Sequence, residues 1–249
     1  MRIAKEIILL DALPADMAVE LAVLRSEILG GFKHIVWPPC AETFTINPVI
    51  HGNGVTPIKD PMMDHLEYNG WTHQVQLRPE ANNGPVDAAK IHGGVRACLE
   101  WETGNAASTY RAMMKIMDAL TFRKIDAAFI VVSDILLAKY LTDRVGKDEE
   151  VKWGGDMLPH LFNHGHVAMI VMEPDGYDKR VPLIAKQNCG NGVVAKRKGK
   201  KPAAPSDQQM NLFTDVYYPD RGDSSSNPDE EEDMLAWGGI AWKNLPRKG

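Results

Sequence analysis

The middle of this chain alternates between short apolar runs and longer amphipathic segments, and this alternation constrains its fold more than any other feature. Residues 127–132 and 167–172 are continuous apolar runs, which are typical of buried strands, and we expect the first strand to span 126–132. Residues 106–122 carry apolar side chains at helical spacing. Strands that alternate with helices indicate a layered α/β fold with a mixed sheet. All of these apolar runs are far shorter than a bilayer requires, so we expect no membrane segment.

Other segments extend this prediction. The periodicity predicts a helix over residues 14–29, a helix over 134–141 that Asp134 would cap, and a short strand over 181–184. Residues 37–60 are rich in turn signals. The three cysteines are scattered and form no Cys-x-x-Cys pair, so we expect neither a disulfide framework nor a zinc ribbon. A reducing cytoplasm is the expected location.

The clearest chemical signal is the motif Glu100-Trp101-Glu102, which ends the second strand of a hairpin predicted over 86–91 and 95–102. Strand side chains alternate between faces, so the two glutamates of the motif share one face. A turn thirteen residues before the first of them ends on Asp87. Three carboxylates at one sheet edge suit a hard divalent cation. A solvated strand edge is the alternative explanation of a lone Glu-x-Glu pair.

Two further features suggest contact with DNA. Asn105 is suited to cap the helix that follows the acidic strand, and a helix that starts beside a metal can lie against a nucleic-acid groove. In Asp143-Arg144 the arginine can bind guanine through two hydrogen bonds while the aspartate accepts one from cytosine. A surface ion pair at a helix end is the alternative. The net charge of −5 argues mildly against nucleic acid, but it averages over all faces of the protein.

Segments spread over residues 37–198 occur in an order and spacing that resemble one known family. They are Trp37-Pro38, Thr43-Phe44-Thr45-Ile46-Asn47, Asn53-Gly54-Val55, Pro57-Ile58-Lys59, Gly84-Pro85-Val86-Asp87, the acidic strand, Arg111, Lys124-Ile125-Asp126, Tyr140-Leu141-Thr142-Asp143-Arg144-Val145, Glu149-Glu150 and Val181-Pro182-Leu183-Ile184. The chain resembles the BamHI family of type II restriction endonucleases. The resemblance implies a restriction-endonuclease-like core of the PD-(D/E)XK type, with a central mixed β-sheet flanked by helices. It also implies a homodimer that cleaves palindromic double-stranded DNA with Mg²⁺, and GGATCC as the site.

The resemblance assigns catalytic roles to the acidic cluster. Asp87 and Glu100 match the family's metal ligands, and the carbonyl of Trp101 completes the protein ligands. Glu102 matches a second glutamate, which either deprotonates the attacking water or only positions it. The family has one more acid upstream. Here that position falls near residues 71–74, which contain no acid, and Gln74 is the best match.

The resemblance also assigns residues to DNA recognition. Asp143 and Arg144 match the readers of one G·C pair, Arg111 a second guanine reader and Asn105 a base-contacting residue, while Lys59 matches a lysine close to the DNA. The chain departs from the family at Ala107, where a serine helps to read the inner base pair, and Ser108 or water is the candidate substitute. A sequence-specific DNA-binding protein with weak or lost cleavage is the alternative function.

The domain prediction separates an endonuclease domain over 1–195 from an extension over 196–249 that is first basic and then acidic and that we expect to be weakly ordered. Within the extension, Gln209-Met210-Asn211-Leu212-Phe213 resembles a motif that binds the sliding clamp, although such short patterns also occur by chance. The predicted dimer interface is the methionine-rich face of the helix over 106–122 together with residues 145–162. Packing of that face inside one protomer is the alternative.

Overall fold

A mixed six-stranded sheet forms the centre of the computed structural model, which describes residues 1–103, 106–142, 145 and 148–186. The strand order is β1-β7-β6-β5-β4-β3, and β6 is parallel to both of its neighbours while the outer pairs are antiparallel. In chain order these strands are β1 (Arg2–Ala12), β3 (Thr72–Val75), β4 (Val86–His92), β5 (Val95–Glu102), β6 (Ala127–Ser133) and β7 (Gly165–Glu173). A separate parallel pair joins β2 (Thr45–Ile46) to β8 (Gly176–Tyr177). The predicted α/β class with a mixed sheet is confirmed.

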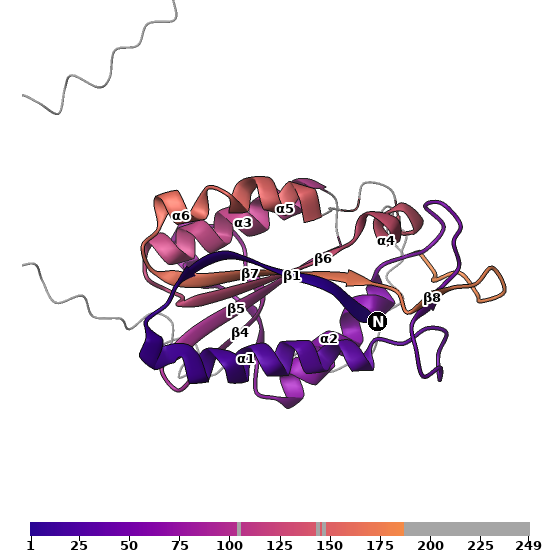
Figure 1. The fold of residues 1–249 in the computed structure, drawn as a ribbon, viewed down its shortest axis with the longest axis horizontal. Helices are drawn as coiled ribbons and strands as arrows, with labels where there is room; N and C mark the ends of the chain where they lie inside the picture. Colours follow the sequence, from indigo (N-terminus) through magenta and orange to yellow (C-terminus); the bar gives the residue numbers. More distant parts are fainter. Residues whose placement is uncertain (104–105, 143–144, 146–147, 187–249) are drawn as a thin grey trace, which may run out of the picture. The chain divides into compact units, whose positions relative to one another are not determined.

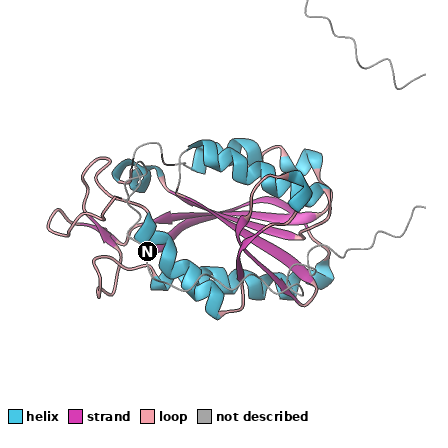
Figure 2. Ribbon diagram, turned by 180° about the vertical axis from the view of Figure 1, so that it is seen from behind, coloured by secondary structure: helices cyan, strands magenta, loops and turns pink. Residues whose placement is uncertain are grey.

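Helices cover both faces of the sheet (Figures 1 and 2). One face packs against α1 (Ala18–Gly31) and α2 (Thr56–Tyr68), and the other against α3 (Ala106–Thr121), α5 (Asp148–Gly155) and α6 (Leu158–Leu161). The short α4 (Ile135–Tyr140) follows β6, and the described residues also include the 3₁₀ turns η1 (Ala15–Met17), η2 (Phe32–His34) and η3 (Pro79–Ala81). Within the described residues, no helix is long and apolar enough to cross a membrane.

The core forms because neighbouring residues of each buried strand point to opposite faces. In β6, Phe129 and Val131 belong to the cluster under α1 and α2, whereas Ala128, Ile130 and Val132 belong to the cluster under α3. Both faces of β6 are apolar, as expected for a central strand covered on two sides. The neighbouring strand β5 is likewise buried where it carries the acidic motif.

Several predicted elements are confirmed. The hairpin is β4 and β5, paired antiparallel from Ala88 opposite Leu99 to His92 opposite Val95. The helix predicted over 106–122 is α3, and the one predicted over 14–29 corresponds to η1 and α1. Asp134 caps α4, where its side chain accepts a hydrogen bond from the Leu137 N–H at 2.7 Å.

Three regions differ from the sequence-based prediction. The first residues form β1, an edge strand that the sequence pattern did not indicate. The turn-rich segment leads into α2, which has Pro57 in its first turn, a position that proline tolerates. The strand predicted over 181–184 is wrong. That segment carries no strand, and its Ile184 bonds instead to the buried Asn53 and to the Gly54 N–H.

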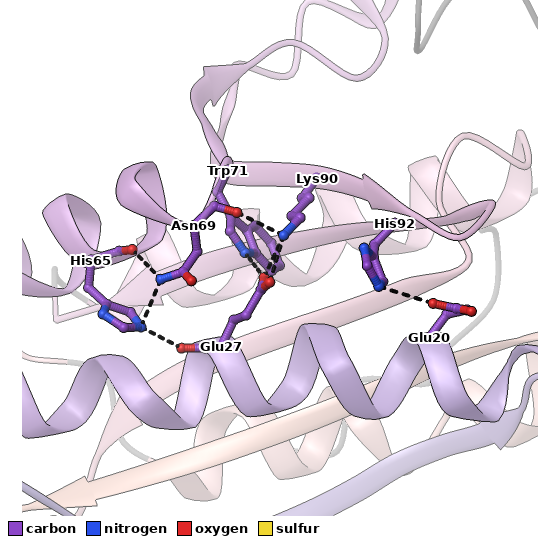
Figure 3. A network of polar contacts seen from close by, with 7 residues as sticks. All are labelled: Glu20, Glu27, His65, Asn69, Trp71, Lys90 and His92. Carbon is purple, nitrogen blue, oxygen red and sulfur yellow. Dashed lines mark hydrogen bonds and ion pairs between the residues drawn. The ribbon is translucent and has the colours of Figure 1, made fainter.

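A polar network fastens α1 to the edge of the sheet (Figure 3). Lys90 of β4 donates hydrogen bonds to both carboxylate oxygens of Glu27 at 2.7 and 2.8 Å, and a third to the Asn69 carbonyl. The Trp71 indole donates to the same carboxylate at 2.8 Å. The side chains of Lys90 and Glu27 are 14% and 18% exposed, so this is a largely buried and fully paired ion pair.

Candidate active site

The predicted acidic residues meet at one end of the β4–β5 hairpin. Because the two strands are antiparallel, the start of β4, with Asp87, lies beside the end of β5, with Glu100 and Glu102. The Trp101 N–H donates a hydrogen bond to Asp87 Oδ2 at 2.8 Å, which fixes this carboxylate against the acidic strand. The structure thus brings together all three predicted catalytic carboxylates and Trp101, whose carbonyl was the predicted third metal ligand.

Two of the three carboxylates are buried. Glu100 is 2% exposed and Glu102 is 6% exposed. Burial raises the pKa of Glu100 to about 7, against the opposing effect of the Lys115 ammonium. Burial likewise raises the pKa of Glu102, although a hydrogen bond from Ser108 opposes the rise. The cluster concentrates negative charge where water cannot stabilise it, which favours the binding of a cation.

Two lysines supply positive charge from opposite faces of the sheet. Lys59 of α2 forms an ion pair with Asp87 Oδ1. Lys115 of α3 forms an ion pair with Glu100 Oε1 and donates a hydrogen bond to the Pro85 carbonyl at 2.8 Å. Each helical layer therefore contributes one ammonium group to the acidic cluster.

Lys115 was missed by the sequence analysis. It occupies a polar position beside the apolar stripe of α3, and such a position normally indicates a solvated face. The one available signal was its place four residues after Arg111, on the same side of a helix that follows the acidic strand.

Ser108 and Gln74 complete the surroundings of the carboxylates. Ser108 donates a hydrogen bond to Glu102 Oε2 at 2.6 Å, so its hydroxyl is directed at the catalytic candidate. Gln74 lies on the neighbouring strand β3, and its side-chain amide donates to Asp87 Oδ1 at 3.3 Å. An amide donor thus stands next to the aspartate, and the match of Gln74 to the family's upstream acid stays a prediction.

The donor set suits a hard divalent cation, because buried carboxylate oxygens are its preferred ligands. Within the described residues, no group of three or more acidic, histidine or cysteine side chains is already arranged to hold a metal ion. Asp87 and Glu100 are instead engaged by the two lysines. The carboxylates therefore fit the cation chemically, with ammonium groups as their present counter-ions.

The recognition candidates are only partly described. Arg111 is exposed on α3, one helical turn before Lys115. Lys59 lies at the acidic cluster, and Ala107 is exposed near the start of α3. Asn105, Asp143 and Arg144 lie outside the described residues, as do the extension over 196–249 and its motif at 209–213, so those assignments stay predictions.

Comparison with known proteins identifies the family. The family described as "Restriction endonuclease BamHI" matches residues 1–191. The chain is 35% identical over 176 residues to the type II restriction enzyme OkrAI of Oceanobacter kriegii, covering 70% of this chain and 91% of the relative. It is 33% identical over 218 residues to the type II restriction enzyme BamHI of Bacillus amyloliquefaciens, covering 81% and 96% respectively.

A crystal structure of restriction endonuclease BglII complexed with a DNA 16-mer superposes with a TM-score of 0.46 and 13% sequence identity, over 71% of this chain and 86% of that one. The family match and both curated relatives span the β4–β5 hairpin with its buried carboxylates. The chain therefore belongs to the BamHI family of type II restriction endonucleases, which are DNA-binding, DNA-cleaving hydrolases.

Proposed function

We propose that this protein is a Mg²⁺-dependent type II restriction endonuclease that hydrolyses palindromic double-stranded DNA at GGATCC. The observation that carries the proposal is the convergence of Asp87, Glu100 and Glu102 on one end of the β4–β5 hairpin, two of them buried. Family membership supports the same reading. The enzyme would act in the cytoplasm, where Cys40 and Cys98 would remain thiols, as they are in the structure.

Asp87, Glu100 and the main-chain carbonyl of Trp101 are the residues that would hold the cation. Bound Mg²⁺ would supply positive charge to the scissile phosphate and lower the pKa of a coordinated water. The hydrogen bond from the Trp101 N–H orients Asp87 in advance. Lys59, which touches Asp87 from α2, would sit close to the phosphate of bound DNA.

Glu102 is the candidate for work on the attacking water. Its raised pKa means that the carboxylate holds a proton more readily than an exposed glutamate does, which suits a general base. Ser108 donates a hydrogen bond to Oε2 at 2.6 Å, and among the described residues no hydrogen bond to Oε1 is seen, so Oε1 is the oxygen that would face the water. Proton removal would occur at that atom.

Recognition would come from α3 and from the segment that follows α4. Arg111 is exposed on α3, one helical turn before Lys115, and a guanidinium can bind guanine through two hydrogen bonds. Arg144 with Asp143 would read one G·C pair, and Asn105 would contact a base. Through these matches the recognised site would be GGATCC. Ala107 lacks the hydroxyl that the family's serine offers to the inner base pair.

A two-fold DNA site calls for two copies of the protein, so we infer that the enzyme is a homodimer. Exposed apolar side chains on α3 and around α6 support an interface there, namely Tyr110, Met114, Met157 and Leu161. Met113 and Ile116 pack inside the protomer, so only part of the methionine-rich face remains available. Sedimentation showing monomers at every concentration that cleaves DNA would contradict the dimer.

The alternative is a DNA-binding protein of the same fold with weak or lost cleavage. Gln74 favours it, because an amide donor beside Asp87 adds no charge to hold a cation. Digestion of a plasmid that carries a single GGATCC tests both. The proposal expects linear product with ends inside that sequence in Mg²⁺, and none from a plasmid with one base pair of the site changed. A shifted band in a gel without cleavage would support the alternative.

A further inference from the structure

Lys115 joins the two halves of the acidic cluster. Its ammonium forms an ion pair with Glu100 Oε1 on β5 and donates a hydrogen bond at 2.8 Å to the carbonyl of Pro85, in the turn that leads to Asp87. The Lys115 side chain is only 15% exposed, and that of Glu100 is 3% exposed. This contact lies inside the protein, so it is only weakly screened by water.

A cation at this site and this ammonium compete for the same carboxylate. A divalent ion held by Glu100 takes the lone pairs of its carboxylate oxygens, and Oε1 is already in contact with Lys115. Two cations within one coordination shell repel each other strongly at low dielectric. The Lys115 ammonium at Oε1 therefore opposes loading of the metal site, and its withdrawal from Glu100 favours loading.

The helix that carries Lys115 is also the helix that faces the DNA in the proposed function. Arg111 lies four residues before it, so the two side chains project from the same side of α3, one turn apart. A helix moves as a stiff rod over such a distance. A shift of α3 that brings Arg111 onto a base would therefore also move Lys115 relative to Glu100 on the sheet.

We propose that Lys115 is a positioning residue whose ammonium occupies the cation's place at Glu100 in the free enzyme. When DNA binds, α3 shifts relative to β5, and the ammonium leaves Glu100. The residue would thus suppress metal loading without DNA and make loading depend on recognition. This inference rests on the proposed function, because it takes Glu100 to be a metal ligand.

The chain offers a matched control. Lys90 is another lysine paired with a glutamate, at nearly the same exposure, but on the α1 side of the sheet and in no contact with the acidic cluster (Figure 3). The substitutions Lys115→Met and Lys90→Met each remove one buried charge and keep the unbranched stem. A general effect of breaking a buried pair would appear in both variants.

The experiment is calorimetric titration of Mn²⁺ into the full-length protein, alone and bound to a GGATCC duplex whose scissile phosphates are replaced by methylphosphonates. For the free protein we expect Lys115→Met to bind Mn²⁺ about tenfold more tightly than wild type, because a repelling charge has gone. Lys90→Met should bind as wild type does. With DNA present, the difference in Mn²⁺ affinity between Lys115→Met and wild type should fall to about twofold or less. In the DNA-bound wild type the Lys115 ammonium has already left Glu100.

Lys115→Gln, which is also neutral but shorter, serves as a second variant if the first does not fold by circular dichroism. Equal Mn²⁺ affinity of wild type and the Lys115 variants without DNA would overturn the inference, while cleavage of GGATCC by wild type in the same preparation would leave the proposed function intact. Absence of both Mn²⁺ binding and cleavage in wild type would overturn the proposed function, and the inference with it.

Discussion

Replacing the buried Glu100 by glutamine should flatten the dependence of stability on pH. The folded protein raises the pKa of Glu100 from an ordinary value of 4.5 to about 7 by burial, so the folded state prefers the protonated form. The stabilisation of this protonated form is fully present below pH 4.5 and is lost as the pH rises through about 7. That change corresponds to a loss of roughly 3 kcal/mol in the free energy of unfolding.

The assay is urea unfolding followed by circular dichroism at pH 5, 6, 7 and 8, in EDTA, for wild type and Glu100→Gln. Wild type should lose stability from pH 5 to about 7 and then level off towards pH 8, and the variant should lose far less. A smaller slope remains because the pKa of Glu102 is also raised. Glu42→Gln, at an exposed carboxylate, is the control and should follow wild type.

Comparing slopes rather than absolute stabilities avoids one complication. Glutamine leaves the Lys115 ammonium without its counter-ion, which lowers the stability of the variant by an amount that does not vary over this pH range. Mg²⁺ at pH 8 should stabilise wild type and leave Glu100→Gln unchanged. Parallel pH curves for wild type and Glu100→Gln would refute the argument that burial of this carboxylate opposes its charge.

Four other substitutions test individual roles. Glu100→Ala should abolish cleavage yet retain DNA binding in a gel-shift assay with Ca²⁺; normal turnover in Mg²⁺ would remove this residue from the metal site. Arg144→Ala should abolish cleavage at the specific site while circular dichroism remains that of wild type, and unchanged cutting at that site would disprove its part in recognition. Ser108→Ala removes a hydrogen bond that lowers the pKa of Glu102, so the acid side of the pH profile of cleavage should move to higher pH; an unmoved profile would show that Glu102 does not limit the rate. Gln74→Glu adds a carboxylate beside Asp87 and should lower the Mg²⁺ concentration needed for half-maximal cleavage several-fold, whereas a higher requirement would argue against a lost metal-supporting acid.

The sequence predicts the β4–β5 hairpin and its carboxylates well, because their positions follow from strand alternation. Glu100 and Glu102 share a face by period two, and the antiparallel return brings Asp87 beside them. The same holds for β6, which is apolar on both faces. Local sequence patterns are sufficient to predict a strand where its burial is continuous and its hydrogen-bonded pairing with the neighbouring strands is regular.

Strand β1 escaped prediction for a physical reason. Its pairing with β7 shifts between Ile3 and Lys5 and again between Ile8 and Leu10. Each irregularity changes which face the following side chains take, so the strand shows no continuous alternation in sequence. Helix α2 was hidden differently, because it contains Pro57 and Pro61, and proline normally interrupts a helical pattern although this helix accommodates both.

The pairing of Lys115 with Glu100 was not predictable from either segment alone. A lysine beside an apolar helical stripe is most often solvated, and only the packing of α3 over the sheet carries it to the carboxylate. The ion pair of Lys59 with Asp87 depends in the same way on α2. Contacts between layers arise from tertiary packing, and no local pattern encodes them.

The supply of one ammonium group from each helical layer has a consequence for variation in this enzyme. Met62 of α2 and Ile116 of α3 are fully buried against opposite faces of the sheet, and each sets how far its helix, and hence its lysine, stands from the acidic cluster. A genetic selection for enzymes that work at altered Mg²⁺ concentration should therefore recover mild changes at these apolar positions. The Mg²⁺ concentration that the enzyme needs would then depend on the packing of the core as well as on the metal ligands themselves.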